Sequence, residues 1–377
     1  MQLDTIQSSW THWRYLMSEE PKKPPASTRS IRDVATEAGV SVGTVSNVLN
    51  RPEIVAPATR ARVEFVIGQL DFVRNESARH LRTGRSRTIG LVVLDASNPF
   101  FTDVARGVED AATASGLAVI LCNSDQRIDR ESRYLDLLEE HRVQGILITP
   151  VKGVNERVRR LQERGTPVVL LDRKTSTRTF CSVSVADVRG GELAAAHLVE
   201  RGHRRIAFVG GPLNLAQVRD RHKGARQVLM AAGLPESALI GVETSSLNFS
   251  AGRSAGAWIA EMAPKLRPTA VFCANDLLAL GLLQEMTRRQ IRVPGDIAIV
   301  GYDDIDFAAA AAVPLSSVQQ PREQLGRAAA ELLIAEALED TAHAHRQLVF
   351  EPELVVRDSS DLKRRNAVPA RSVGSGA

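Results

Sequence analysis

The chain has 377 residues, enough for two or three domains, and its 44% hydrophobic and 24% charged residues are typical of a soluble protein. Its formal net charge of +4 is too small to indicate a polyanionic partner by itself. No apolar run approaches the roughly 18 residues of a membrane span, and the N-terminus does not resemble a signal peptide. A membrane protein is therefore excluded, and we expect a cytoplasmic location.

The three cysteines, Cys122, Cys181 and Cys273, are far apart and lack metal-ligand spacing. Each lies in or beside an apolar run, which favours a small core residue in a reducing compartment. We therefore expect no metal site. Residues 1–29 include the proline-rich run KKPPAS, and we predict that they form a disordered N-terminal arm.

The stretch from Ser30 to Asn50 has the pattern of two short helices joined by a tight turn. Ser30 and Asp33 have the spacing of a capping box, which predicts a helix directly after Ser30. Gly39 can adopt the left-handed conformation that ends a helix, and Ser41 is a good N-cap for a second one. The pattern predicts a helix-turn-helix, although a helical hairpin of any small α domain has similar spacing.

The outer face of the second predicted helix is small and polar, which suits a helix lying in the DNA major groove. Asn47 stands at a base-reading position, and asparagine pairs naturally with adenine. Because Val42 and Gly43 are small, direct base contacts from this helix are expected to be few. The expected DNA contacts of the helix are Ser41, Val42, Gly43, Thr44, Ser46, Asn47 and Asn50.

A third amphipathic helix is predicted from about Pro57 to Leu70, which completes a headpiece of residues 30–74. It is followed by the basic run RNESARHLRTGRSR, with five arginines and one acidic residue, Glu76. This is the place in the chain where a contact with the phosphate backbone is expected.

The order and spacing of these segments resemble the LacI/GalR family of bacterial transcriptional regulators, and the resemblance extends to about Asp358. It implies that residues 75–87 are a hinge helix and linker that fold on operator DNA as a pair across the dimer axis. Leu81 would be inserted between base pairs from the minor groove, although it could instead be an ordinary buried leucine. The expected DNA contacts of the hinge are Asn75, Arg79, Leu81 and Arg82.

From Thr88 onward, buried strands alternate with helical stretches, which predicts doubly wound parallel sheets. A second such unit begins with RIAFVGGP, so two α/β lobes of the periplasmic-binding-protein type are expected. We assign the effector-binding and dimerisation domain to residues 88–361, with one lobe of 88–187 plus 320–361 and another of 188–319. Residues 362–377 are polar, carry no leucine heptads and are predicted to be a disordered tail.

Polar residues stand at the carboxyl ends of several predicted strands, where open α/β sheets bind ligands. The sequence has no recognisable nucleophile and base, phosphate loop or metal motif, so we expect neither catalysis nor a cofactor. By family resemblance, Asp172, Arg221, Asn275 and Asp303 line an effector site. The full expected set is Asn98, Phe100, Phe101, Asp172, Arg173, Arg221, Leu247, Asn275, Asp303 and Gln320.

Each of these residues also has a structural interpretation. Asn275 could cap the next helix, Asp303 could lie in a turn, and Arg221 could form an ion pair with Asp220 or Glu243. If Arg221 contacts the effector, its replacement by alanine should leave a folded protein that no longer responds to the ligand.

The ligand is expected to be a sugar. Leu247 stands where some sugar-binding members carry an aromatic residue, and Arg173 and Arg322 add positive charge near the expected cleft. These departures leave room for a sugar acid or a sugar phosphate.

Together these features predict a homodimeric, sequence-specific transcriptional regulator, most often a repressor, that binds a palindromic operator under the control of a small effector. The alternative is a sugar-binding protein of the periplasmic type without a transcriptional role. The headpiece and the lack of a signal peptide argue against this alternative.

Overall fold

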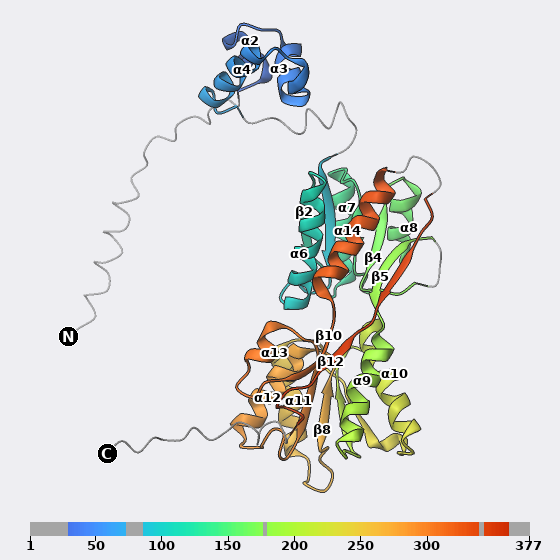
Figure 1. Ribbon diagram of the computed structural model, residues 1–377. Coiled ribbons are helices and arrows are strands. Elements are labelled where there is room, and N and C mark those ends of the chain that lie inside the picture. Colours follow the sequence, from blue (N-terminus) through green and yellow to red (C-terminus); the bar gives the residue numbers. More distant parts are fainter. Residues whose placement is uncertain (1–28, 73–85, 176–178, 339–342, 362–377) are drawn as a thin grey trace, which may run out of the picture. The chain divides into compact units, whose positions relative to one another are not determined.

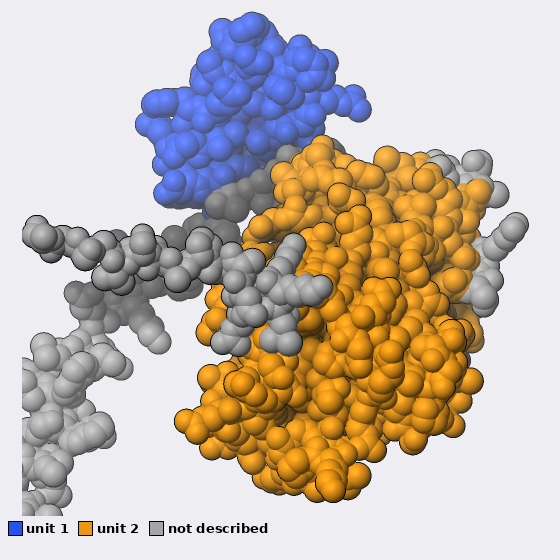
Figure 2. All heavy atoms as spheres, turned by 60° about the horizontal axis from the view of Figure 1, so that its bottom comes forward, with its two compact units in different colours: residues 1–83 blue, residues 84–377 orange. Residues whose placement is uncertain are grey.

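The computed structural model describes residues 29–72, 86–175, 179–338 and 343–361 (Figure 1). The chain divides into two compact units, Met1–Thr83 and Gly84–Ala377 (Figure 2). In the described residues no helix combines the length and the apolar content that a membrane crossing requires.

The first unit is a small helical headpiece with its own apolar core. Its elements are α2 (Ile31–Glu37), α3 (Val42–Asn50), the 3-10 helix η1 (Pro52–Ile54) and α4 (Pro57–Gln69). Val34, Val45 and Val63 are fully buried at the meeting point of the three α-helices. The predicted helix-turn-helix and third helix are therefore confirmed.

The second unit contains two α/β lobes, as predicted. In the first lobe the sheet order is β11-β5-β4-β3-β1-β2, and all its strand pairs are parallel. Its strands are β1 (Thr88–Val93), β2 (Ala118–Asn123), β3 (Ile146–Ile148), β4 (Val168–Leu171), β5 (Cys181–Val185) and β11 (Gln347–Phe350), and its helices are α6 (Pro99–Ala114), α7 (Ile128–Glu140), α8 (Glu156–Glu163) and α14 (Arg322–Leu338).

In the second lobe the sheet order is β12-β10-β9-β8-β6-β7, and only β12 runs antiparallel to its neighbour. Its strands are β6 (Ile206–Val209), β7 (Leu239–Val242), β8 (Ala270–Cys273), β9 (Ala298–Asp303), β10 (Ser316–Gln319) and β12 (Glu353–Val355), and its helices are α9 (Asp187–Glu200), α10 (Ala216–Ala231), η2 (Glu236–Ala238), α11 (Phe249–Glu261), α12 (Asp276–Arg288) and α13 (Asp306–Ala310).

The chain passes between the lobes after β5, after β10 and between β11 and β12, where the ribbons connect in Figure 1. The expectation that all of residues 320–361 belong to the first lobe is wrong for the last segment. β12 pairs with β10 of the second lobe, and Ser359 accepts and donates hydrogen bonds there. Pro352, which has no backbone N–H, lies between β11 and β12.

The helix α14 reaches the first lobe from a distant part of the sequence and packs closely on α6. Two glycines permit this approach. A Cβ atom at Gly107 would lie 2.0 Å from the carbonyl oxygen of Glu323, and one at Gly326 would lie 2.0 Å from that of Val104. The backbones of the two helices are therefore in direct contact, which fixes the start of α14 beside the cleft.

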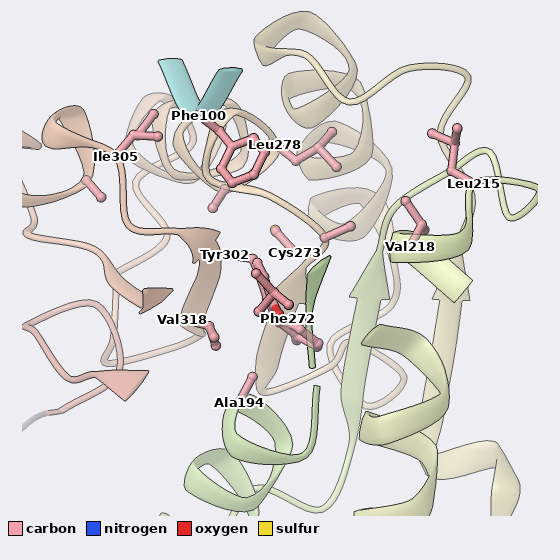
Figure 3. Close-up of a cluster of buried hydrophobic side chains, with 14 of the residues drawn as sticks. Phe100, Ala194, Leu215, Val218, Phe272, Cys273, Leu278, Tyr302, Ile305 and Val318 are labelled. Carbon is pink, nitrogen blue, oxygen red and sulfur yellow. The ribbon is translucent and has the colours of Figure 1, made fainter. Parts of the chain in front are cut away.

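One hydrophobic cluster extends through both lobes. Figure 3 shows Phe100 of α6, from the first lobe, in the same cluster as Leu278 and Tyr302 of the second lobe. The lobes consequently meet through apolar contacts as well as through the connecting strands.

Candidate functional site

The first helix of the headpiece begins with the predicted capping box. The backbone N–H of Ser30 donates to Oδ2 of Asp33 at 2.7 Å, and the N–H of Asp33 donates to Oγ of Ser30 at 3.4 Å. The bond from the Ser30 N–H, together with one from the Ser30 hydroxyl to the same oxygen at 3.0 Å, holds the pKa of Asp33 below its usual value. The start of α2 is therefore determined locally, as the sequence predicts.

The turn and the second helix also follow their predicted chemistry. Gly39 adopts φ +63°, and the following N–H, that of Val40, donates to the carbonyl of Ala35 at 3.0 Å. Oγ of Ser41 accepts from the N–H of Thr44 at 3.0 Å and also contacts the Thr44 hydroxyl. Both side chains thus help to begin α3.

The outward face of α3 contains Val42, Gly43, Asn47 and Asn50, all exposed. The amide of Asn50 donates to the carbonyl oxygen of Ser46 at 2.7 Å, so part of its hydrogen-bonding capacity is used within the helix. Asn47 consequently remains the strongest candidate for a base contact. The predicted hinge contacts Asn75, Arg79, Leu81 and Arg82 lie outside the described residues and stay predictions.

Replacing Asn47 with arginine is expected to move the base preference at one symmetric pair of operator positions toward guanine, because arginine pairs with guanine as asparagine does with adenine. The shift should correspond to about 1–3 kcal/mol of discrimination. Selection from a randomised operator library measures it, with effector affinity as the control that should not change. An unchanged preference would show that Asn47 does not contact bases.

The effector candidates meet at a cavity between the carboxyl ends of strands from both lobes. Eight of the ten predicted residues line it: Asn98, Phe100, Phe101, Asp172, Arg221, Leu247, Asn275 and Asp303. Asp95, which also stands at a predicted strand end, is part of the lining, and so are five residues that the sequence did not indicate: Leu94, Gln126, Leu215, Gln217 and Val218. Strand ends and helix starts supply most of them, as expected for an open α/β sheet.

Arg221 is buried on α10 and has contacts on every side of its guanidinium group. Its Nε donates to Oδ1 of Asp187 at 2.7 Å, and its Nη1 donates to the carbonyl oxygen of Ala274 at 2.7 Å. Nη1 also lies 3.8 Å from Oδ1 of Asp303, and the guanidinium carbon lies 3.6 Å from the centre of the Tyr302 ring. Arg221 is therefore in an ion-pair network as well as in the cavity wall.

The partners of Arg221 differ from those considered in the sequence analysis. Asp220 accepts a hydrogen bond from Arg219, whereas the close partner of Arg221 is Asp187 at the start of α9. The two helices come together because Gly191 has no side chain: a Cβ there would lie 2.0 Å from the carbonyl oxygen of Arg221. Asp187 was missed because only the packing of α9 on α10 brings it to the site.

The two carboxylates predicted to bind the ligand are held by amide side chains. Nε2 of Gln217 donates to Oδ2 of Asp172 at 2.9 Å, and the Oδ1 atom of Asp172 is buried without a protein hydrogen bond. Asp303 accepts from Gln320 at 2.7 Å and from Asn98 at 3.3 Å. Since Asn98 belongs to the first lobe and Asp303 to the second, the latter bond joins the lobes.

Gln320 and Arg173 are the two predicted residues that are not part of the cavity lining. Gln320 acts on the site through Asp303, so it is a positioning residue. Arg173 lies beside Gly153, and the other extra cation, Arg322, is paired with Asp103 at 3.0 Å. Neither arginine is part of the cavity lining, although the charge of Arg322 offsets part of the rise that burial causes in the pKa of Asp303.

Asn275 caps a helix and also lies in the cavity wall, while its contact with an effector stays a prediction. Its Oδ1 accepts from the N–H of Leu278 at 3.0 Å and caps α12, while its Nδ2 donates to the carbonyl oxygen of Leu247 at 2.9 Å. The same side chain lines the cavity. The cap orients the amide, and the bond to Leu247 fixes that residue at the cavity wall.

The site has an excess of acidic groups. Burial raises the pKa of Asp172 to about 8 and that of Asp303 to about 6, and Arg221 offsets part of each rise. Burial also raises the pKa of Asp187. Three carboxyls therefore share one guanidinium, and the cavity disfavours further negative charge.

Asp172→Asn is expected to stabilise the protein by about 1–3 kcal/mol at pH 8 and to abolish effector binding. The pKa of an aspartate in the unfolded chain is about 3.9. When the folded protein raises this pKa, the free energy of unfolding falls as the pH rises from the unfolded value to the folded value. The gain should therefore shrink as the pH falls toward 5. Denaturant unfolding of both proteins at pH 5 and pH 8 measures it, and a gain independent of pH would contradict this assignment.

A helix-turn-helix headpiece and a two-lobed ligand cavity in one chain define a DNA-binding regulator that responds to a small molecule. Comparison with known sequences agrees: residues 30–75 match the model of the bacterial regulatory proteins of the lacI family, and residues 195–360 match that of a periplasmic binding protein-like domain.

Two curated relatives cover nearly the whole chain. The HTH-type transcriptional repressor PurR of Aliivibrio fischeri (strain ATCC 700601 / ES114) is 35% identical over 336 residues, covering 88% of this chain and 98% of the relative. The ribose operon repressor of Escherichia coli (strain K12) is 33% identical over 335 residues, covering 88% and 99%.

Solved structures of similar fold include regulators of the same family. The lac repressor dimer bound to operator and the anti-inducer ONPF has a TM-score of 0.76 and 25% identity, covering 88% of this chain and 99% of the other. A LacI family regulator from Enterococcus faecium with bound ribose has a TM-score of 0.67 and 30% identity, covering 72% and 98%.

The chain belongs to the lacI family of bacterial regulatory proteins. It is a DNA-binding transcriptional regulator whose operator binding is controlled by an effector, and its relatives are repressors rather than enzymes. The alternative of a sugar-binding protein without a transcriptional role is thereby set aside, because the headpiece itself matches the family.

Proposed function

We propose that this regulator responds to a neutral monosaccharide and binds a palindromic operator as a homodimer. The observation that carries the effector class is the charge of the cavity. Asp172 and Asp303 line the cavity, Asp187 lies behind Arg221, and in the described part of the chain Arg221 is the one guanidinium in contact with Asp187 and Asp303. The carboxylate of a sugar acid or the phosphate of a sugar phosphate would add repulsion to this group.

The hydrogen-bonding groups of the cavity suit hydroxyls. The Oδ1 atom of Asp172, which is buried without a protein hydrogen bond, can bond to a sugar hydroxyl. The rings of Phe100 and Phe101 pack edge to face with their centres 5.0 Å apart and, with Leu247, supply an apolar wall. A pyranose or furanose presents hydroxyl groups to hydrogen-bonding side chains and C–H groups to an apolar wall, and the cavity offers both kinds of surface. The bound ribose of the Enterococcus faecium structure supports this class.

The cavity is small, about 40 Å³, whereas ligand sites are usually about 300–1,000 Å³. A sugar can therefore enter only if the lobes move apart or their side chains rearrange. Contacts that join the lobes beside the cavity include the Asn98–Asp303 hydrogen bond, the bonds from Gln217 to Asp172, and the pairing of Arg322 with Asp306. A ligand that replaces the Asn98–Asp303 bond shifts the equilibrium between the closed and open positions of the lobes. The size of this shift is set by the difference between its affinities for the two positions. This is the step through which the effector controls DNA binding.

Isothermal titration and thermal shift against a matched panel test the effector class. The panel contains neutral pentoses and hexoses, the corresponding aldonic acids and sugar phosphates, and nucleobases. A ligand at about 100 times its Kd should stabilise the protein by about 2.7 kcal/mol. Tighter binding of an acid, a phosphate or a nucleobase than of any neutral sugar would overturn the proposal.

Two variants locate the ligand in the cavity. Asp303→Asn should weaken sugar binding roughly 10- to 100-fold, because a hydrogen bond to a charged group is lost. Arg173→Gln should leave the affinity unchanged, because Arg173 is not part of the lining. Weaker binding in Arg173→Gln together with unchanged binding in Asp303→Asn would place the ligand next to Arg173, outside the cavity.

The homodimer is supported by an exposed apolar groove on the second lobe. It runs over α11, α12 and α13, which lie together in Figure 1. Phe307 is 61% exposed and Phe249 is 39% exposed there. The other apolar lining residues are Leu277, Leu280, Leu283, Ala310, Ala311 and Ala312. We infer that a second copy of the chain covers this groove, because a two-fold pair of headpieces is what a palindromic operator requires.

A further inference from the structure

A cluster of side chains that could bind a metal lies in the first lobe, at the end of the sheet opposite the effector cavity. Cys181 is the first residue of β5, Glu336 lies near the end of α14, and His343 and His345 precede β11. The effector cavity is at the other end of these parallel strands. The cysteine spacing alone indicated no metal site, because the histidines are 162 and 164 positions away from Cys181.

The ligand atoms converge on one point. Sγ of Cys181 lies 3.2 Å from Nε2 of His343 and 3.7 Å from Nδ1 of His345. Oε2 of Glu336 lies 4.0 Å from the first nitrogen and 3.9 Å from the second. In tetrahedral zinc sites the metal–ligand bonds are about 2.0–2.3 Å, so the ligand atoms are roughly 3.3–3.8 Å apart. The observed separations match this geometry with only small adjustments.

The surroundings of the cluster favour a bound metal. The backbone N–H of Arg346 donates to Sγ of Cys181 at 3.3 Å, the kind of outer bond that supports a metal thiolate. The second ring nitrogen of His345 contacts the side-chain amide of Gln162 at 3.4 Å, which directs Nδ1 of that ring toward the sulfur. All four ligand residues are buried or half-buried.

We propose that Cys181, Glu336, His343 and His345 bind one Zn²⁺ ion. A thiolate, two imidazoles and a carboxylate are a donor set that suits zinc and does not suit magnesium or calcium. Four protein ligands complete a tetrahedron and leave no open position, so the ion stabilises the fold and has no catalytic role.

The consequence of binding follows from the segments that are joined. β5 and β11 lead directly into two of the connections between the lobes, and α14 follows the third. The ion ties together these three elements at the ends opposite the cavity. It therefore makes the first lobe more rigid without touching the effector.

The test uses the full chain stripped with a chelator and then titrated with Co²⁺ and Zn²⁺. A tetrahedral thiolate site gives intense visible cobalt bands and a sulfur-to-cobalt charge-transfer band in the near ultraviolet. We expect one ion per chain, displacement of Co²⁺ by Zn²⁺ and a higher Tm with Zn²⁺.

Three variants complete the experiment. Cys181→Ser should lose the charge-transfer band, and His345→Gln should weaken binding by more than the roughly 10- to 100-fold that is typical of losing an outer partner. Cys122→Ser, a buried cysteine of β2 outside the cluster, should bind as the parent does. If Cys181→Ser does not fold, His345→Gln alone decides. Absence of a tetrahedral cobalt spectrum in the parent, or its persistence in the cluster variants, would overturn the proposal.

Discussion

Replacing Arg221 with alanine is expected to destabilise the protein by about 3–5 kcal/mol and to abolish effector binding. Arg221 is 5% exposed and is the only cation among the buried carboxyls of Asp172, Asp187 and Asp303 that the described residues supply. Without it these groups lose their counter-charge, and the Tyr302 ring loses the guanidinium packed over it. The expectation from the sequence was milder, namely a folded protein that only fails to respond.

Urea unfolding and sugar titration of the same protein measure the two effects. Arg219→Ala is the matched control, because Arg219 is the neighbouring arginine, is largely exposed and pairs with Asp220 at the surface. Such a pair typically contributes about 0.2–1 kcal/mol. The destabilisation of the Arg221 variant should be smaller at pH 5 than at pH 8, because the carboxyls can then be protonated in the folded state. A urea unfolding curve like that of the parent would show that the ion-pair network of Arg221 does not stabilise the fold.

The sequence was sufficient wherever structure depends on neighbouring residues. The capping box of Ser30 and Asp33, the turn at Gly39 and the cap at Ser41 were predicted correctly because each needs only a few adjacent residues. The buried strands were predicted for a similar reason, since parallel strands appear as short apolar runs.

Contacts between distant segments were much harder to predict. Asp187 reaches Arg221 only because two glycine-containing helices pack backbone to backbone. Arg173 follows a lining residue directly in the sequence yet is not part of the lining, because Asp172 adopts φ +50° and redirects the chain.

Strand pairing and the metal-binding cluster were also hard to predict, because each joins segments that are far apart in the sequence. β12 lies in the segment 320–361, which was assigned to the first lobe, but it belongs to the sheet of the second lobe. The cluster around Cys181 depends on three segments that no spacing rule connects. The family resemblance supplied the effector residues that spacing alone could not have brought together.

Phe307→Glu is expected to convert the dimer to a monomer and to weaken operator binding about 10²–10⁴-fold. Phe307 lies on α13 at the edge of the apolar groove and is 61% exposed in the single chain. In the proposed dimer a glutamate there would replace the apolar contacts of the phenylalanine and place a charge in a groove lined mainly by apolar side chains. Each headpiece would then bind its half-site alone, without the high effective concentration that the linkage provides.

Sedimentation and operator titration at one fixed salt concentration measure this prediction, since affinity for DNA depends steeply on salt. Trp258→Glu is the matched control: Trp258 is 49% exposed on the same lobe but lines a different pocket, beside Thr244. The control should remain dimeric and bind operator normally, and both variants should still bind the effector, because neither side chain is part of the cavity lining. A monomeric parent protein, or a Phe307→Glu dimer with full operator affinity, would place the interface on another face of the lobes.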